Sequence, residues 1–492
     1  MIDFRRFYRH TAIYTAGNFV YRAASFLLVP MYVHTLSPAT FGTLELITTT
    51  VLIIQAVLSS GVAHAAMRFY FEYKEPEKKN AVISTALIGS FLFAGFGALL
   101  CVMAAPWISK IVFHTAGYAL AFRLACISLV LEISREINLS YIRARERSLL
   151  FIAMAVVQLV TQVGASIFAV VHLHLGVVGI LSANMAATFC VWIVLTIFTI
   201  RDCGLRFQPR LLLPIARYSH PLMLSALSGS IFQSLDRYFL NGFVSLQALG
   251  MYALSMRFAN VIPVFATTPF TNSYGPYRFS IMQEADARTT YARIARYYML
   301  AAGFLMVLIA AFCREAVQLL ASKEYWSAYK VVPLLIIPGA LGGLNYCFQT
   351  GIYVQKSTKQ LFHISIVAGF INLAGLILFI PRFGVLGAVM ASVIAFAYTI
   401  THTYRTAQKL FRVPYQLGKI GRIFAVVCAL AAISSHIQID QIWHAIVLKL
   451  LFVALYPVVV VIVGAFEAQE LRSMLAFLRP FAIREQARSI AS

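Results

Sequence analysis

The chain contains 492 residues, of which 60% are hydrophobic and only 12% are charged. Soluble domains carry roughly a quarter charged residues, so this composition excludes several water-exposed globular domains and indicates that most of the surface faces lipid. The net charge of +22 does not indicate a nucleic-acid partner, because the basic residues lie in short clusters between long apolar segments, as in polytopic inner-membrane proteins. The seven cysteines are dispersed and form no CxxC pair, so they suggest neither a metal site nor a disulfide framework.

Apolar segments long enough to cross a bilayer recur along the whole chain. A spanning helix needs about 20 mostly apolar residues, and the sequence therefore predicts an all-α polytopic membrane protein with fourteen transmembrane helices. In chain order we expect them at 11–33, 42–67, 81–105, 118–140, 150–171, 177–200, 215–240, 248–272, 295–318, 331–353, 361–381, 384–404, 420–437 and 442–466.

The distribution of lysine and arginine gives an independent test of this number. If the connecting segments alternate between inside and outside, starting inside, 29 basic residues fall inside and five fall outside. A miscounted helix would invert the alternation and destroy the asymmetry. We therefore expect a multi-pass protein of the bacterial inner membrane with both termini in the cytoplasm. The first apolar segment carries Arg22 and no small-residue cleavage site follows it, so we expect it to be retained.

Two pairs of similar motifs lie at the same separation in the chain. Gly176 and Gly384 open predicted helices 6 and 12, Gly42 and Gly250 open helices 2 and 8, and both pairs are 208 residues apart. This offset predicts two parallel six-helix repeats, between which transporters commonly place their substrate. The expected divisions are an N-terminal lobe (1–205), a C-terminal lobe (206–413), helices 13 and 14 (414–466) and a cytoplasmic tail (467–492).

Charged residues within the predicted helices are candidate functional residues, because each costs at least about 2.5–3.5 kcal/mol at the centre of an inserting helix. Arg22 lies near the middle of helix 1, one turn from Asn18 on the same face. The pair suggests an anion-binding position in a hydrated cavity. An ion pair between Arg22 and another helix, for example at Glu45, is the alternative.

Helices 7 and 8 carry further charges at similar expected depth. Asp236 and Arg237 lie one turn inside the outer end of helix 7, and Arg257 and Asn260 lie about two turns into helix 8. Asp236 and Arg257 could therefore pair, either as an outer gate or proton-responsive group or as a static brace.

Other charged positions have simpler interpretations. The spacing of Glu132, Arg135 and Glu136 predicts that they neutralise one another along helix 4. Lys449 lies two turns from the outer end of helix 14, and we expect its side chain to extend to the membrane–water interface. No Walker A, GxSxG or HExxH motif is present, so the sequence carries no ATPase or hydrolase signature.

Several strings of residues resemble the bacterial polysaccharide (O-antigen and exopolysaccharide) flippases of the multidrug/oligosaccharidyl-lipid/polysaccharide exporter superfamily. These are Asp236-Arg-Tyr-Phe-Leu-Asn241, Gly250-Met-Tyr-Ala-Leu-Ser-Met-Arg-Phe-Ala-Asn260, Pro269-Phe and Gly275-Pro-Tyr-Arg-Phe279, with Gly42-Thr-Leu-Glu-Leu46, Arg68-Phe-Tyr-Phe-Glu72 and Ile380-Pro-Arg-Phe-Gly-Val-Leu-Gly-Ala388. The resemblance covers nearly the whole chain.

The resemblance implies two six-helix lobes around a cavity lined by helices 1, 2, 7 and 8. It also implies alternating access that carries an undecaprenyl-pyrophosphate-linked oligosaccharide from the cytoplasmic to the periplasmic leaflet. Guanidinium groups near the cavity would hold the pyrophosphate. The expected substrate-binding residues are Arg22, Asn18, Arg68, Arg257, Asn260 and Arg278, and the expected coupling or gating residues are Glu45, Asp236 and Arg237.

Two other functions are weaker alternatives. A multidrug/cation antiporter of the same superfamily would favour a cavity rich in acids, whereas basic residues outnumber acidic ones here. A membrane-embedded polysaccharide polymerase or ligase would carry a large periplasmic loop, whereas the longest expected outside loop, around 321–330, is short. We therefore expect a transporter that performs no covalent chemistry, needs no cofactor or metal, and works with lipid-linked oligosaccharide, membrane lipids and, as further candidates, polymerase and chain-length proteins.

Overall fold

The computed structural model describes residues 27–59, 61–436 and 442–464, and within these ranges the chain is helical and contains no β-strand. It divides into two compact units. The first comprises the chain up to Ala253 with Leu320–Tyr325 and Ile380–Val385, and the second comprises Leu254–Leu319, Trp326–Phe379 and the chain from Leu386 onward. The lobe boundary at 205/206 stays a prediction, since it is defined by the duplication rather than by compactness.

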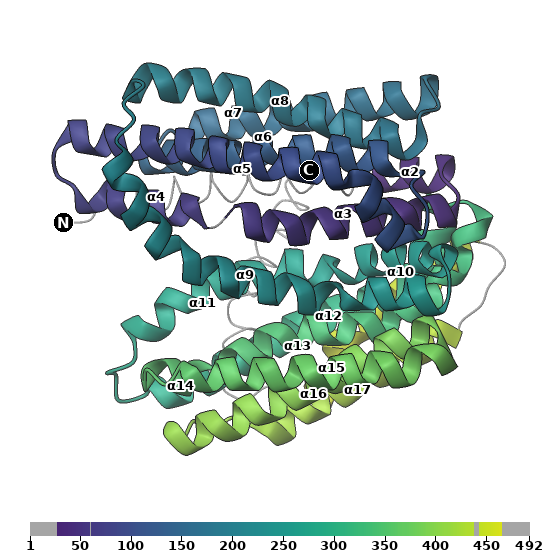
Figure 1. Cartoon of the computed structure of the whole chain (residues 1–492). Helices are drawn as coiled ribbons and strands as arrows, with labels where there is room; N and C mark the ends of the chain where they lie inside the picture. The colour runs from purple at the N-terminus through teal and green to yellow at the C-terminus, as the bar shows by residue number, and fades with distance from the viewer. Residues whose placement is uncertain (1–26, 60, 437–441, 465–492) are drawn as a thin grey trace, which may run out of the picture. The chain divides into compact units, whose positions relative to one another are not determined.

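The first unit is built largely from long, nearly continuous helices, of which α5, α6, α7 and α8 lie side by side (Figure 1). Proline occupies the start of α3, α5 and α9, where the missing N–H costs no helical hydrogen bond. The elements are α2 (Val29–Thr35), α3 (Pro38–Leu58), α4 (Val62–Glu72), α5 (Pro76–Phe113), α6 (Ala119–Ala144), α7 (Ser148–Ile167), the π-helix η1 (Phe168–His172), α8 (Gly176–Cys203), α9 (Pro209–Phe243) and the first part of α10 (Leu246–Ala259).

The second unit contains the remainder of α10 and most of the later helices, apart from the residues Leu320–Tyr325 and Ile380–Val385. Its elements are the π-helix η2 (Pro263–Thr267), α11 (Thr268–Ser280), α12 (Ala287–Leu320), the 3₁₀ helix η3 (Lys323–Val331), α13 (Val332–Phe348), α14 (Thr350–Val354), α15 (Lys359–Phe383), α16 (Val385–Leu410), α17 (Leu417–His436) and α18 (Ile442–Ile462). Helix α18 packs on α12, where the Tyr456 hydroxyl donates to the Leu300 carbonyl at 2.9 Å and an added Cβ at Gly303 would meet both Tyr456 and Val427.

Ten helical segments of the described chain are long and apolar enough to cross a membrane. They cover ten of the fourteen predicted helices. Of the other four, 11–33 lies mostly outside the described residues, α6 and α9 are helical throughout but more polar, and the apolar part of α18 is shorter, Ile446–Ile462. A helical, multi-pass membrane protein is therefore confirmed, whereas the number fourteen and the N-in/C-in orientation stay predictions.

The predicted continuous helix 42–67 is divided in two. Helix α3 ends at Leu58 and α4 begins at Val62, with Gly61 between them in the left-handed region at φ +65°. Glycine adopts this conformation without steric cost. Within a membrane, interrupted helices are tolerated where they are buried in protein or line a hydrated cavity. The interruption therefore marks a place to look for a cavity.

The glycines that revealed the 208-residue offset also occupy matching environments. Gly176 and Gly384 are both left-handed, at φ +53° and +56°. A Cβ at Gly42 would overlap the Leu246 carbonyl oxygen, and a Cβ at Gly250 would overlap that of Pro38. Positions 38 and 246 are again 208 apart. Such a reciprocal contact is the arrangement expected of two copies related by a two-fold axis, and it brings the α3 and α10 backbones into close approach.

Candidate functional site

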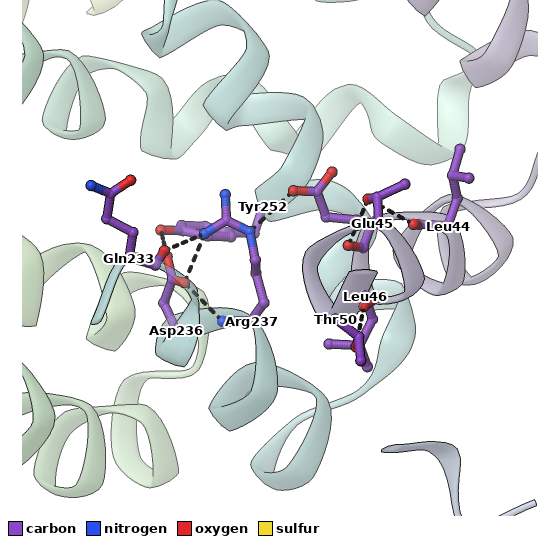
Figure 2. A network of polar contacts seen from close by, with 9 residues as sticks. Leu44, Glu45, Leu46, Thr50, Gln233, Asp236, Arg237 and Tyr252 are labelled. Atoms are coloured by element: carbon purple, nitrogen blue, oxygen red, sulfur yellow. Dashed lines mark hydrogen bonds and ion pairs between the residues drawn. The ribbon is translucent and has the colours of Figure 1, made fainter. Parts of the chain in front are cut away.

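Three charged residues predicted to gate or couple transport lie together in the first unit. The Arg237 guanidinium donates from Nε to Glu45 Oε1 at 3.0 Å and from Nη1 to Asp236 Oδ1 at 2.9 Å. Tyr252 completes the cluster, because its hydroxyl donates to Asp236 Oδ2 at 2.5 Å (Figure 2). We call Glu45, Asp236, Arg237 and Tyr252 the α3–α9 junction. It joins α3 to the consecutive helices α9 and α10, which lie about 190 residues later in the chain.

The side chains of the junction are shielded from solvent. The exposed fractions are 16% for Arg237, 11% for Glu45 and 10% for Asp236. Arg237 Nη1 also donates to the Gln233 carbonyl oxygen at 2.9 Å, and the Arg237 backbone N–H donates to Asp236 Oδ1 at 2.9 Å. With two carboxylates and a backbone carbonyl as acceptors, the guanidinium is held in one orientation, which rigidifies a buried polar network.

Neutral hydrogen bonds extend the attachment of α9 to its neighbours. Thr50 of α3 and Tyr238 of α9 share a hydroxyl hydrogen bond of 2.8 Å, and Asn241 Nδ2 donates to the Val112 carbonyl of α5 at 3.0 Å. Tyr252 is a member of the junction that the sequence interpretation missed. The only signal was its place in the Gly250–Asn260 string, where it has no charge to single it out.

A second buried arginine, Arg278 of α11, is held very differently. Its exposed fraction is 4%, and its guanidinium carbon lies 4.0 Å from the ring centroid of Tyr353 and 4.6 Å from that of Tyr346. Nη2 donates to the Tyr346 hydroxyl at 3.2 Å, whereas Nε and Nη1 have no hydrogen-bond partner among the described residues. We call Arg278, Tyr346 and Tyr353 the Arg278 cage. Cation–π contacts stabilise the charge there, and two N–H donor groups remain available to an anion.

The other predicted substrate-binding residues are less informative. Asn18 and Arg22 lie outside the described residues. Arg68 is exposed on α4, with its guanidinium 4.5 Å from the centroid of the Tyr218 ring. Arg257 is half-buried on α10 and Asn260 is exposed just beyond that helix. Their roles in substrate binding, and the pairing of Asp236 with Arg257, stay predictions.

Cavities with some polar and charged residues in a mostly apolar lining occur in the first unit, next to the interruption between α3 and α4. The larger has a volume of about 320 Å³ and is lined by α3, α4, α6 and α9. A neighbouring cavity of about 180 Å³ lies between α3, α6 and α8, and Leu52, Gln55 and Glu132 line both. The polar residues lining the larger cavity include Gln55, Ser59, His64, Glu132, Arg135, Glu136, Ser140 and Ser230.

The expected mutual neutralisation of Glu132, Arg135 and Glu136 is wrong. Glu136 pairs with Arg143 at 2.8 Å, Arg135 donates to Gln158 of α7 at 3.0 Å, and Glu132 accepts from Asn184 of α8 at 3.3 Å. Spacing along one helix predicts only which side chains can meet on its own surface. Packing of α7 and α8 against α6 provides the partners of Arg135 and Glu132, whereas Glu136 meets Arg143 two turns later on α6 itself.

The expectation that Lys449 extends to the interface is also wrong. Lys449 is 1% exposed and its Nζ lies 2.7 Å from Glu315 Oε1 of α12. The sequence interpretation did not single out Glu315, although it lies within predicted helix 295–318. Burial of α18 against α12 encloses both charges, so this ion pair fastens the C-terminal helices within the second unit.

Comparison with known proteins then identifies the family. A family model described as "polysaccharide biosynthesis protein" matches residues 34–331, well over half of the chain. The chain belongs to this family. The resemblance to polysaccharide flippases is thereby confirmed at the level of the family. No curated protein sequence matches the chain.

Solved structures show what fold this polysaccharide biosynthesis protein adopts. It is similar to the lipid II flippase MurJ in an inward closed conformation, with a TM-score of 0.75, 12% identity, and coverage of 96% of this chain and 100% of that one. A multidrug resistance MATE transporter of the MOP superfamily in an inward-facing conformation gives a TM-score of 0.62 at 15% identity, covering 82% and 95%. The bent form of the Vibrio cholerae MATE transporter VcmN gives 0.52 at 15% identity, covering 83% and 98%. At these identities the likeness establishes only that the chain has the fold of these proteins.

Proposed function

We propose that the protein is a flippase that moves an undecaprenyl-pyrophosphate-linked oligosaccharide from the cytoplasmic to the periplasmic leaflet by alternating access, for cell-surface polysaccharide synthesis. The observation that carries the proposal is a polysaccharide biosynthesis family on a transporter fold. The family model indicates a role in polysaccharide biosynthesis, and the fold is similar to that of transporters. The two together favour transport of the glycan over its covalent polymerisation or ligation. We place the protein in the bacterial inner membrane, with fourteen spans and both termini inside.

The α3–α9 junction is the proposed outer gate. In the predicted topology the start of α3, the end of α9 and the start of α10 all lie at the periplasmic side. By the 208-residue duplication, α3 belongs to one lobe and α9 and α10 to the other. The ion pairs of Arg237 and the close approach at Gly42 and Gly250 would thus join the two lobes at that side. Opening toward the periplasm requires these contacts to separate. Glu45 and Asp236 are the acids whose protonation would weaken them.

Arg278 is the proposed anchor for the pyrophosphate. A guanidinium presents a planar set of donors that matches phosphate oxygens, and Nε and Nη1 of Arg278 are unpartnered among the described residues. Binding an anion there breaks no salt bridge. Arg22, Arg68 and Arg257 are proposed to add positive charge along the path, with Asn18 and Asn260 as neutral donors for the sugar, while the polyprenyl chain stays in lipid.

The test is transport by purified protein in liposomes. Fluorescent lipid-linked oligosaccharide in one leaflet should become accessible from the other over time, and mass spectrometry should recover it unchanged. Failure of the glycan to cross would overturn the proposal, and elongation or transfer of the glycan would indicate the polymerase or ligase alternative. Uptake of cationic drugs in place of glycan movement would indicate the antiporter.

Variants of Arg278 test the anchor in the same assay. Arg278→Ala should lower the initial rate by roughly tenfold or more, the loss expected for a charged hydrogen-bonding partner. Arg278→Lys should restore only part of the rate, because lysine binds phosphate as a point charge. Arg405→Ala, which removes an exposed arginine of α16, is the matched control and should keep the full rate. Equal rates for all three variants would remove Arg278 from the substrate path.

A further inference from the structure

The segment that joins α12 to α13 passes from one compact unit to the other in the middle of η3. Leu320–Tyr325 belong to the first unit, and Trp326–Phe379 belong to the second. By the 208-residue duplication, the corresponding connection is the one between α5 and α6. It spans only 114–118, whereas the connection between α12 and α13 spans 321–331. The duplicated helices therefore do not by themselves require the longer connection, and its contacts indicate a further role.

Tyr325 attaches the first half of η3 to the turn between α2 and α3. Its exposed fraction is 0%, and its hydroxyl donates to the Leu36 carbonyl oxygen at 3.1 Å. Its ring meets that of Phe41 edge to face, with the centroids 6.1 Å apart, which is a favourable aromatic geometry. Leu36 ends α2 in an extended conformation, so its carbonyl lies outside the helical hydrogen-bond series. All three residues belong to the first unit.

The turn that receives Tyr325 is itself fixed within the first unit. Tyr32 of α2 and Ser166 of α7 share a hydroxyl hydrogen bond of 3.4 Å. Ser37 caps α3, because its Oγ accepts from the Thr40 N–H at 3.3 Å. With both helices of the turn held in this way, loss of the contact requires the η3 segment itself to move.

The second half of η3 is attached within the second unit. The Ser255 hydroxyl of α10 donates to the Ala328 carbonyl oxygen at 2.8 Å, and both residues are buried. Ala328 follows Tyr325 by only three residues, so even a fully extended chain lets their backbones separate by at most roughly 10 Å. A larger separation of the two attachment points requires one of them to break. The second half continues directly into α13, which leaves Tyr325 as the end that can detach.

We infer that Leu320–Val331 form an outer strap, and that Tyr325 must leave the α2–α3 turn before the transporter opens toward the periplasm. In the predicted topology the turn and the strap both lie on the periplasmic side. The strap thus acts beside the α3–α9 junction as a second closure. The role in opening rests on the proposed function, whereas the attachment of Tyr325 does not.

The two closures differ in chemistry. The junction consists of ion pairs, which protonation of Glu45 or Asp236 would weaken. The contact of Tyr325 consists of a neutral hydrogen bond and an aromatic pair. It contains no charge, so neither protonation of acids nor screening by salt should release it. Movement of the strap is what separates it.

Hydrogen exchange of the purified full-length protein tests the attachment without any glycan. Tyr325→Ala should speed exchange of the backbone amides in peptides covering 36–46 by roughly tenfold, because a hydrogen bond and a ring contact are lost. Tyr325→Phe keeps the ring and should give a smaller increase. Tyr329→Ala is the matched control, since it removes a half-buried tyrosine from the second half of η3, and it should leave these peptides unchanged. Peptides of α7 should exchange at the wild-type rate throughout, which excludes general unfolding.

A covalent lock tests whether the strap has to open. Replacement of Tyr325 by p-benzoylphenylalanine should give, on irradiation, a cross-link to the α2–α3 turn that peptide mass spectrometry identifies. The initial rate of glycan movement in liposomes should then fall in proportion to the cross-linked fraction. The same replacement at Tyr329 is the control, and irradiation should leave its rate unchanged.

The results separate the strap from the flippase. Unchanged exchange in Tyr325→Ala, or an equal increase in Tyr329→Ala, overturns the strap whether or not the glycan crosses the liposome membrane. Full transport by the cross-linked protein also overturns it, because the attachment would then not have to open. Faster exchange confined to the Tyr325 variants, with transport blocked by the cross-link, supports it. If the wild type moves no glycan, the flippase is overturned, and the exchange results alone decide the attachment of Tyr325.

Discussion

Arg237 and Arg278 are both buried cations, yet their surroundings differ in the property that matters for anion binding. Arg237 donates to two carboxylates and a backbone carbonyl. Arg278 lies between tyrosine rings, with two nitrogens unpartnered in the described chain. The first is neutralised by acids, and the three charged side chains of its junction sum to a negative charge. The second keeps its positive charge.

The difference in hydrogen-bond acceptors decides which of the two arginines could bind an anion. An anion that approached Arg237 would have to displace Glu45 or Asp236 and meet their charge, which is unfavourable in a low dielectric. An anion that approached Arg278 would displace only aromatic faces, whose cation–π contribution is about 0.5–2 kcal/mol. The proposals that the α3–α9 junction holds the outer gate closed and that the Arg278 cage receives the pyrophosphate both rest on this difference.

The largest effect is expected from Arg237→Ala. It removes the guanidinium that Glu45 and Asp236 share, and loss of one member of a buried ion pair typically costs about 3–5 kcal/mol. The thermal midpoint in detergent should fall strongly. Adding Glu45→Gln and Asp236→Asn to Arg237→Ala removes the stranded charges and should recover most of the loss. A single variant as stable as the wild type would contradict the structural assignment.

A smaller effect is expected from Gly42→Ala. The new methyl group would overlap the Leu246 carbonyl, and overpacking of this kind costs about 1–3 kcal/mol. Helices α3 and α10 must then move apart. Gly95→Ala on α5 is the control, because a Cβ there meets nothing within 4 Å. It should be neutral or stabilise by up to about 1 kcal/mol through helix propensity. Equal thermal midpoints for the two variants would argue against the close approach.

The smallest effect is expected from Tyr353→Leu. It deletes the ring 4.0 Å from the Arg278 guanidinium and should lower stability by about 0.5–2 kcal/mol. Tyr353→Phe keeps the ring and should behave as the wild type. The difference in thermal midpoint between these two variants measures the aromatic contribution. If Phe and Leu were equivalent, the cage would not hold the cation.

The sequence was enough to identify most of the charged residues of the site, but not to predict which of them contact one another. Rarity of charge in apolar segments was enough to select Glu45, Asp236 and Arg237. Their pairing was not predictable, because Glu45 and Arg237 are 192 residues apart. Tyr252 carried no charge and was missed. Glu132 was assigned to neighbours on its own helix, whereas its partner Asn184 lies 52 residues later on α8.

The sequence by itself determined a helical, membrane-spanning chain and the positions of most helices, because apolar length and the placement of basic residues are local properties of each segment. Only the tertiary structure decided that Lys449 is buried against Glu315, that Arg237 is held by two carboxylates while Arg278 is not, and that Glu132 faces a cavity. The environment of a side chain in the membrane depends on which helices pack against its face, and those helices come from distant parts of the chain.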